Sequence, residues 1–198
     1  MTNADADSSR GNRKGLVITV SGPHGTGKST YARDLAESLR LRYVGAGELF
    51  REFARDKGMS LESFSQYAAD NPDVDHLIDE RTVNEAKKGG VVIDAQLAAW
   101  MIKDQADVKL LLTASDSVRL NRIAQRDHVS FEFARNETLA REKIQRRRYQ
   151  KYYGIDVSDL SIYDLKIDTG LLSIELTRKH ISEAVREFLQ KKETTRSN

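Results

Sequence analysis

The chain contains no cysteine and only two prolines, and both shortages limit what it can be. Without cysteine it has no disulfide and no thiolate metal site, which fits a reducing cytoplasm. Pro23 and Pro72 stand where a helix is expected to begin or a loop to turn. No apolar run approaches the roughly 18 residues of a membrane span, and the N-terminus lacks the apolar core of a signal peptide. We therefore expect a soluble, cytoplasmic protein with no membrane partner.

An excess of charge of one sign is also missing. The 198 residues include 32 Lys and Arg against 30 Asp and Glu, a net charge of +2. Such a balance supplies no general attraction to nucleic acid or to an anionic membrane. The basic run 146–148 lacks interleaved aromatic residues on which bases would stack, so nucleic acid is not an expected partner. The length and the 39% hydrophobic content predict one domain with a sizeable core, and we expect a monomer.

Polar segments flank this expected domain. Residues 1–14 hold one apolar residue larger than alanine, which predicts a disordered tail. Asp5 and Asp7 argue against a transit peptide in this segment. Residues 191–198 form a second polar tail. The folded domain is therefore expected over residues 15–190.

Strand and helix patterns alternate within the domain. Strands are predicted over about 16–20, 41–44, 91–94, 108–113 and 164–169. Helices are predicted over about 28–40, 48–57, 61–70, 73–87, 116–127, 130–152 and 174–189, with Ser130 as an N-cap. Alternation of this kind predicts an α/β fold with a five-stranded parallel sheet, helices on both faces and ligands at the carboxyl ends of the strands.

Residues 22–29 have the glycine-rich pattern of a phosphate-binding loop, ending in Gly-Lys-Ser. The preceding run 16–20 is apolar and β-branched, and the residues that follow have helical spacing, a context that argues against a chance match. Glycine lets the backbone approach an anion closely, and the N–H groups at a helix N-terminus bind phosphate. We expect ATP to be bound by Gly22, Pro23, His24, Gly25, Thr26, Gly27, Lys28, Ser29 and Thr30.

Three of the polar side chains have more specific predicted roles. Lys28 would reach the β- and γ-phosphates, and the Ser29 hydroxyl would ligate Mg²⁺. Asp94 ends the predicted third strand, where a carboxylate beside the loop strand can hold Mg²⁺ directly or through water. The alternative for Asp94, a residue that only caps the next turn, stays open at this point.

Two insertions indicate a kinase rather than a hydrolytic switch or motor. Small-molecule kinases add a helical acceptor-binding segment after the second strand and an arginine-rich lid after the fourth, and residues 47–88 and 115–153 fit these places. Converging guanidinium groups suit the charged oxygens of a transferring phosphoryl group. Helical spacing puts the lid arginines on two faces: Arg119, Arg122 and Arg126 on one, Arg141 and Arg148 on the other. The alternative is a solvated helix pair in which the arginines are neutralised by Glu137, Glu142 and Asp127.

The chain resembles the archaeal-type cytidylate kinases of the nucleoside monophosphate kinase superfamily, over residues 15 to about 187. The phosphate loop is shared by many families, whereas the Ala-Gly-Glu-Leu-Phe-Arg and Tyr-Gly-Ile-Asp elements are more specific. The matching stretches are Ser21–Pro23, Gly27–Thr30, Ala46–Arg51, Asn71–Asp75, Leu97–Met101, Arg122–Arg126, Tyr153–Asp156 and Asp159–Leu165.

The resemblance implies a lid that closes over both nucleotides and transfer of the ATP γ-phosphoryl, with Mg²⁺, to CMP or dCMP. It places Arg51, one turn after a glycine hinge at Gly47, on the acceptor α-phosphate, with Ala46 in the same acceptor-binding element. Arg122 and Arg126 match the lid arginines of the family. The arginines that it assigns to the acceptor or to phosphate are Arg141 and Arg148.

Two acceptor-facing positions depart from the family pattern. Gln96 stands where relatives often have arginine, and Gln145 stands where they often have an acid. Glutamine both donates and accepts hydrogen bonds, so UMP, dTMP or AMP stay open as acceptors. A protein of another class, a nucleotide-binding regulatory module without transfer activity, is the rival hypothesis. Asp75 and Asp79 lie at i and i+4, where they could touch the base or sugar of the acceptor, but we favour the interpretation as a solvated helix face.

Overall fold

A computed structural model describes residues 15–60, 63–64, 67–68 and 71–196. Its centre is a five-stranded sheet in the order β2-β3-β1-β4-β5, and each neighbouring pair is parallel. The strands are β1 (Val17–Ser21), β2 (Arg42–Gly45), β3 (Val91–Asp94), β4 (Val108–Thr113) and β5 (Leu165–Asp168). The predicted α/β fold with a five-stranded parallel sheet is confirmed.

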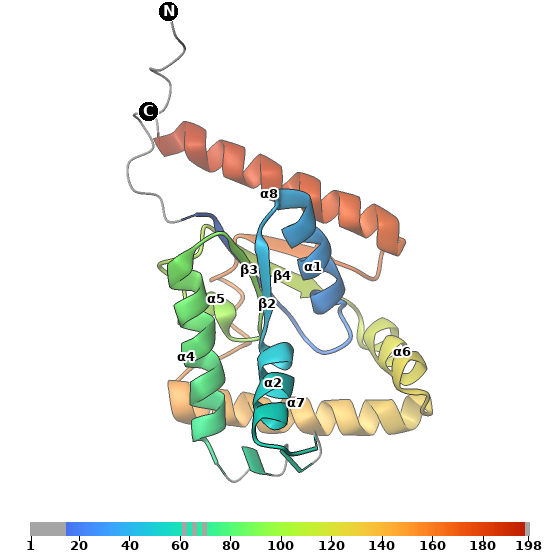
Figure 1. The fold of residues 1–198 in the computed structure, drawn as a ribbon. Coiled ribbons are helices and arrows are strands. Elements are labelled where there is room, and N and C mark those ends of the chain that lie inside the picture. Colours follow the sequence, from blue (N-terminus) through green and yellow to red (C-terminus); the bar gives the residue numbers. More distant parts are fainter. Residues whose placement is uncertain (1–14, 61–62, 65–66, 69–70, 197–198) are drawn as a thin grey trace, which may run out of the picture.

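Both faces of the sheet are covered, because the central strands are apolar on both sides. Ile18 and Val20 of β1 pack with one helical layer, and Val17 packs with the other. All residues of β1 and β3 are buried, which explains their continuous apolar runs. Figure 1 shows α1 and α8 on one side of the sheet and α4 with the short α5 on the other.

The helices follow the predicted order with small differences at their ends. They are α1 (Lys28–Leu39), α2 (Ala46–Asp56), α4 (Asp73–Lys88), α5 (Ala98–Met101), α6 (Asp116–Asp127), α7 (Phe131–Tyr153) and α8 (Ile174–Arg196). Ser130 caps α7, since its hydroxyl accepts from the Phe133 N–H at 3.2 Å. No helix in the described ranges is long and apolar enough to cross a membrane.

Two predicted helices differ from the structure at their ends, and a third falls largely outside the described residues. α2 begins at Ala46, two residues early, so Gly47 lies inside its first turn rather than at a hinge before it. α8 continues to Arg196 instead of ending at 189, because no glycine or proline stops it and Lys192 bonds the Asp107 carbonyl at 2.8 Å. The helix predicted over 61–70 falls largely outside the described residues. The four-residue α5 was not predicted.

The long helix α7 positions the site. It runs across the end of the molecule at which β2 passes into α2 and β4 passes into α6 (Figure 1). This end carries the carboxyl ends of the parallel strands, where ligands of such sheets bind. Because α6 packs on α7 and α2 packs on α4, the expected lid and the expected acceptor-binding segment both border this end.

Candidate active site

The phosphate loop joins β1 to α1 and depends on glycine at two close approaches. Gly22 and Gly25 have positive φ angles of 146° and 80°. A Cβ atom on Gly22 would overlap the carbonyl oxygen of Leu112, and one on Gly25 would overlap that of Arg119. Both positions therefore require glycine for space as well as for conformation. The loop is thus fixed against β4 and α6.

Hydrogen bonds within the loop turn its polar groups inward. The hydroxyl of Thr26 and the ammonium of Lys28 each donate to the Pro23 carbonyl at 2.9 Å. Burial lowers the pKa of Lys28, while the charges of Asp94 and Glu142 oppose that shift. A buried ammonium at the N-terminus of α1 is suited to a phosphate counter-ion. The loop has the geometry expected of an ATP site.

The proposed magnesium ligands lie side by side. Because β3 pairs with β1 in parallel, Val20 lies opposite Asp94, and the Ser29 hydroxyl donates to the Asp94 carboxylate at 2.6 Å. Tyr43 also donates to this carboxylate, at 3.1 Å, and burial raises the pKa of its phenol. A hydroxyl beside a carboxylate fits Mg²⁺, which prefers hard oxygen ligands. The sequence reasoning missed Tyr43.

The three lid arginines on α6 share a helix face but do not converge. Arg119 is 4% exposed and pairs with Glu142 of α7, as the alternative of neutralised lid arginines expects. Arg122 donates to the Thr169 hydroxyl at 2.9 Å and to the Thr169 carbonyl at 2.7 Å. Since that hydroxyl donates to the Thr26 carbonyl, Arg122 lies near the loop. The exposed Arg126 pairs with Asp127.

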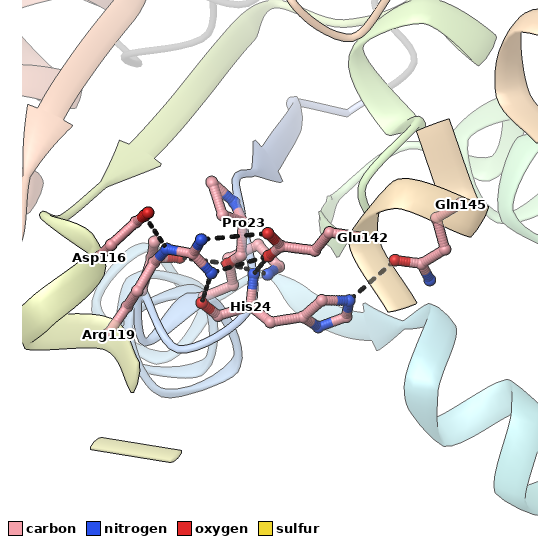
Figure 2. Close-up of polar contacts among 8 residues, drawn as sticks. Pro23, His24, Asp116, Arg119, Glu142 and Gln145 are labelled. Atoms are coloured by element: carbon pink, nitrogen blue, oxygen red, sulfur yellow. Dashed lines mark hydrogen bonds and ion pairs between the residues drawn. The ribbon is translucent and has the colours of Figure 1, made fainter. Parts of the chain in front are cut away.

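A second set of contacts links the loop to α7 through His24. Figure 2 shows the His24 backbone N–H directed at Glu142 and its ring directed at Gln145. Burial and the positive charge of Arg141 lower the pKa of His24 to about 4, so the ring is neutral near pH 7. From the sequence, Glu142 was expected only as a charge partner of the lid arginines. Its hydrogen bond with the phosphate loop was not predicted. Gln145 therefore lies against the loop.

α7 also contacts α4, at the expected acceptor side. Arg148 pairs with Asp75 at 2.7 Å, and Tyr153 donates to Asp79 at 2.6 Å. Both carboxylates are half-buried, and burial raises their pKa values, so the interpretation as a solvated helix face was wrong. α4 and α7 are thus joined by polar contacts.

Gln96 takes part in the same set of contacts. Tyr149 of α7 donates to its side-chain carbonyl at 2.8 Å, and burial raises the pKa of that phenol to about 12. Because its oxygen accepts from Tyr149, Gln96 would donate to a ligand from its side-chain amide nitrogen. Tyr149 and Tyr153 were not predicted as site residues, because nothing in their spacing identifies partners on other segments.

The remaining predicted residues lie around this region. Arg51 is exposed on α2, and its guanidinium extends back over Gly47. Ala46 begins the same helix, and Thr30 is exposed in the first turn of α1. Arg141 is exposed on α7, yet its charge acts on both His24 and Lys28. The structure thus gathers the loop, the Ser29–Asp94 pair and the α7 face, with Arg126 directed elsewhere.

A surface cavity of about 340 Å³ lies away from these groups, between α1 and α8. Its lining includes Asp34, Ser38 and Arg178 and contains no predicted site residue. Arg178 and Asp34 pair across it at 2.5 Å. The candidate site is therefore the phosphate loop with the Ser29–Asp94 pair and the facing side of α7, and not this cavity.

Comparison with known proteins agrees with this geometry. The model of the cytidylate kinase-like family matches residues 17–171. The chain belongs to that family. It is 49% identical to the cytidylate kinase of Staphylothermus marinus over 175 residues, which cover 88% of this chain and 99% of the relative. It is 48% identical to the cytidylate kinase of Aeropyrum pernix over 167 residues, with 84% and 97% covered.

Solved structures support the fold of this family member. A shikimate kinase from Bacteroides thetaiotaomicron superposes with a TM-score of 0.61 at 10% identity, covering 88% of this chain and 98% of the other. A shikimate kinase from Aquifex aeolicus gives 0.59 at 17% identity, with 86% and 96% covered. At these identities the likeness concerns the fold alone. The resemblance to cytidylate kinases inferred from sequence motifs is confirmed by the family match.

Proposed function

We propose that this protein transfers the γ-phosphoryl group of ATP to CMP or dCMP, giving ADP and CDP or dCDP. The proposal rests chiefly on the Ser29–Asp94 contact of 2.6 Å beside Lys28, at the sheet end crossed by α7. It is supported by relatives named cytidylate kinase that are 48–49% identical over most of the chain.

The donor side would work by positioning and charge. The loop N–H groups and Lys28 bind the triphosphate, with Lys28 at its β- and γ-phosphates. Ser29 and Asp94 would hold Mg²⁺, which would neutralise negative charge on the triphosphate. Tyr43 orients the Asp94 carboxylate through its hydrogen bond of 3.1 Å. Arg122 lies close enough to the loop, through Thr169, to stabilise charge on the transferring group.

The acceptor side would lie between the loop, α2, α4 and α7. Arg51 binds the α-phosphate from α2, beside Ala46 and Gly47, and Arg141 and Arg148 approach from α7. Gln96 and Gln145 meet the base or the sugar. Closure of the lid would exclude water before transfer, so ATP alone is hydrolysed slowly.

We also propose that the protein acts as a cytoplasmic monomer on small nucleotides and does not bind nucleic acid. The near balance of its charges supports the last point. Size-exclusion chromatography with light scattering measures the oligomeric state directly. A defined dimer at working concentrations would contradict the monomer.

The acceptor preference is the first prediction. We expect CMP and dCMP to give the highest kcat/KM, with measurable use of UMP or dTMP because Gln96 and Gln145 both donate and accept. The measurement is kcat/KM for AMP, GMP, CMP, UMP, dCMP and dTMP at fixed ATP and Mg²⁺. AMP as the best acceptor by about tenfold, roughly 1.4 kcal/mol in transition-state binding, would contradict the cytidylate assignment. Transfer to no acceptor would favour the rival regulatory module.

The second prediction concerns Arg51. Arg51→Ala should raise the acceptor KM by about 10- to 100-fold, since it removes a charge-assisted contact to phosphate. The KM for ATP should change far less, because the proposal places Arg51 on the acceptor phosphate and not on ATP. Arg55→Ala, an exposed arginine about one turn further along α2, is the matched control. Impaired ATP binding with an unchanged acceptor KM would exclude the assignment.

A further inference from the structure

One residue of the phosphate loop, His24, is tied to both lid helices. Its backbone N–H donates to Glu142 of α7 at 3.2 Å, and its ring Nε2 lies 2.9 Å from the Gln145 side-chain oxygen. Its carbonyl accepts from Arg119 of α6 at 3.4 Å. Figure 2 shows these contacts converging on His24 from opposite sides. The loop is therefore held to α6 and α7 at one point.

Glu142, which accepts the hydrogen bond from the His24 backbone, is itself held in place. Glu142 and Arg119 form two hydrogen bonds, at 2.8 and 3.1 Å, and both residues are more than nine-tenths buried. Arg119 bonds Asp116 as well, at 2.8 Å. A buried bidentate pair with a further partner has little freedom to rearrange. His24 therefore meets α7 in a single defined geometry.

The contact itself shows which end of Gln145 the histidine meets: the side-chain oxygen lies 2.9 Å from Nε2, and a carbonyl oxygen only accepts. Burial and the positive charges of Arg141, Lys28 and Arg119 lower the pKa of His24 to about 4, while the hydrogen bond to Gln145 opposes that shift. A neutral imidazole donates from Nε2 to the Gln145 oxygen. The Gln145 amide nitrogen then points away from the ring, as Figure 2 shows.

Helical geometry places this amide nitrogen on the acceptor side. Gln145 lies on the same α7 face as Arg141 and Arg148, four residues after one and three before the other. The charge of Arg141 acts on the loop residue Lys28, and Arg148 reaches Asp75 of α4. Gln145 thus lies between the loop and α4, where an acceptor has to sit to receive the phosphoryl group.

We infer that His24 is a positioning residue, which holds Gln145 as a hydrogen-bond donor toward the acceptor nucleotide. The inference rests on the proposed function, because only a nucleotide kinase brings an acceptor to this face. The atom of the acceptor that Gln145 meets is an oxygen or an unprotonated ring nitrogen. His24 so couples the donor loop to the acceptor-binding face of α7.

The test compares His24→Ala, Gln145→Ala, the double variant and His24→Gln in the full chain. Each single alanine variant should raise the CMP KM about fivefold, the effect of one lost hydrogen bond, with the ATP KM within about twofold. The double variant should be no worse than either single variant, because both remove the same contact. His24→Gln, whose amide also donates, should restore the CMP KM. Gln150→Ala, an exposed glutamine on α7, is the control.

The outcomes separate this inference from the proposed function. An unchanged CMP KM in His24→Ala, additive losses in the double variant, or failure of His24→Gln to restore the KM would each overturn the role of His24 while leaving a cytidylate kinase. A wild-type protein that phosphorylates no monophosphate would overturn both. If His24→Ala fails to fold, as judged by circular dichroism, Gln145→Ala and His24→Gln still decide between these outcomes.

Discussion

Lys28→Ala is expected to lower kcat by about 10²- to 10³-fold, the loss seen when one preorganised donor to a developing charge is removed. In the proposed function Lys28 places its ammonium at the β- and γ-phosphates, and phosphoryl transfer depends on positioning and charge rather than on covalent chemistry. Among the described residues it donates to one loop carbonyl, that of Pro23 at 2.9 Å, so the variant should stay folded. The measurement is ADP production with CMP, ATP and Mg²⁺.

Lys87→Ala is the control for this variant. Lys87 is exposed near the end of α4 and donates to the side chain of Asn84 on the same helix, at 3.3 Å. Both variants should give the wild-type circular dichroism spectrum, and only Lys28→Ala should lose activity. Equal ADP production by wild type and Lys28→Ala would contradict the assignment of the loop lysine.

The sheet and the contact between Ser29 and Asp94 were predictable because they depend on local sequence and on one topological rule. Buried parallel strands need continuous apolar runs, and the run that ends at Asp94 has this character. The glycine loop fixes where Ser29 lies at the start of α1. Parallel pairing of β3 with β1 then brings the two side chains together, as the 2.6 Å contact shows.

Which acid or hydroxyl each lid arginine contacts was not predictable in the same way. Spacing gives the direction in which a side chain leaves its helix, and Arg119 and Arg122 do leave α6 on one face. Their partners, Glu142 and Thr169, come from distant segments whose approach is set by how α7 and β5 pack. The same reason explains why Asp75 was interpreted as solvated. Its partner, Arg148, follows it by many residues and meets it only in the folded chain.

Glu142→Ala is expected to destabilise the protein by about 3–5 kcal/mol, the cost of breaking a buried ion pair from one side. Arg119 is 4% exposed, and its pair with Asp116 is insufficient compensation because the Asp116 side chain is 69% exposed. For a chain of this size the loss corresponds to a fall in Tm of about 6 to 20 °C. Thermal and urea unfolding followed by circular dichroism measure the change.

Two further variants show whether the uncompensated charge of Arg119 is the cause. Glu137→Ala removes an exposed acid from the same helix and should change the stability by less than about 0.5 kcal/mol. The double variant Arg119→Met with Glu142→Leu removes both charges and should recover most of the loss, because replacing a whole buried pair by apolar residues is often neutral or stabilising. A Glu142→Ala protein as stable as wild type would mean that water reaches Arg119 and that the ion pair contributes nothing to the lid. A double variant as unstable as Glu142→Ala would instead assign the loss to packing, since no buried charge would then remain to explain it.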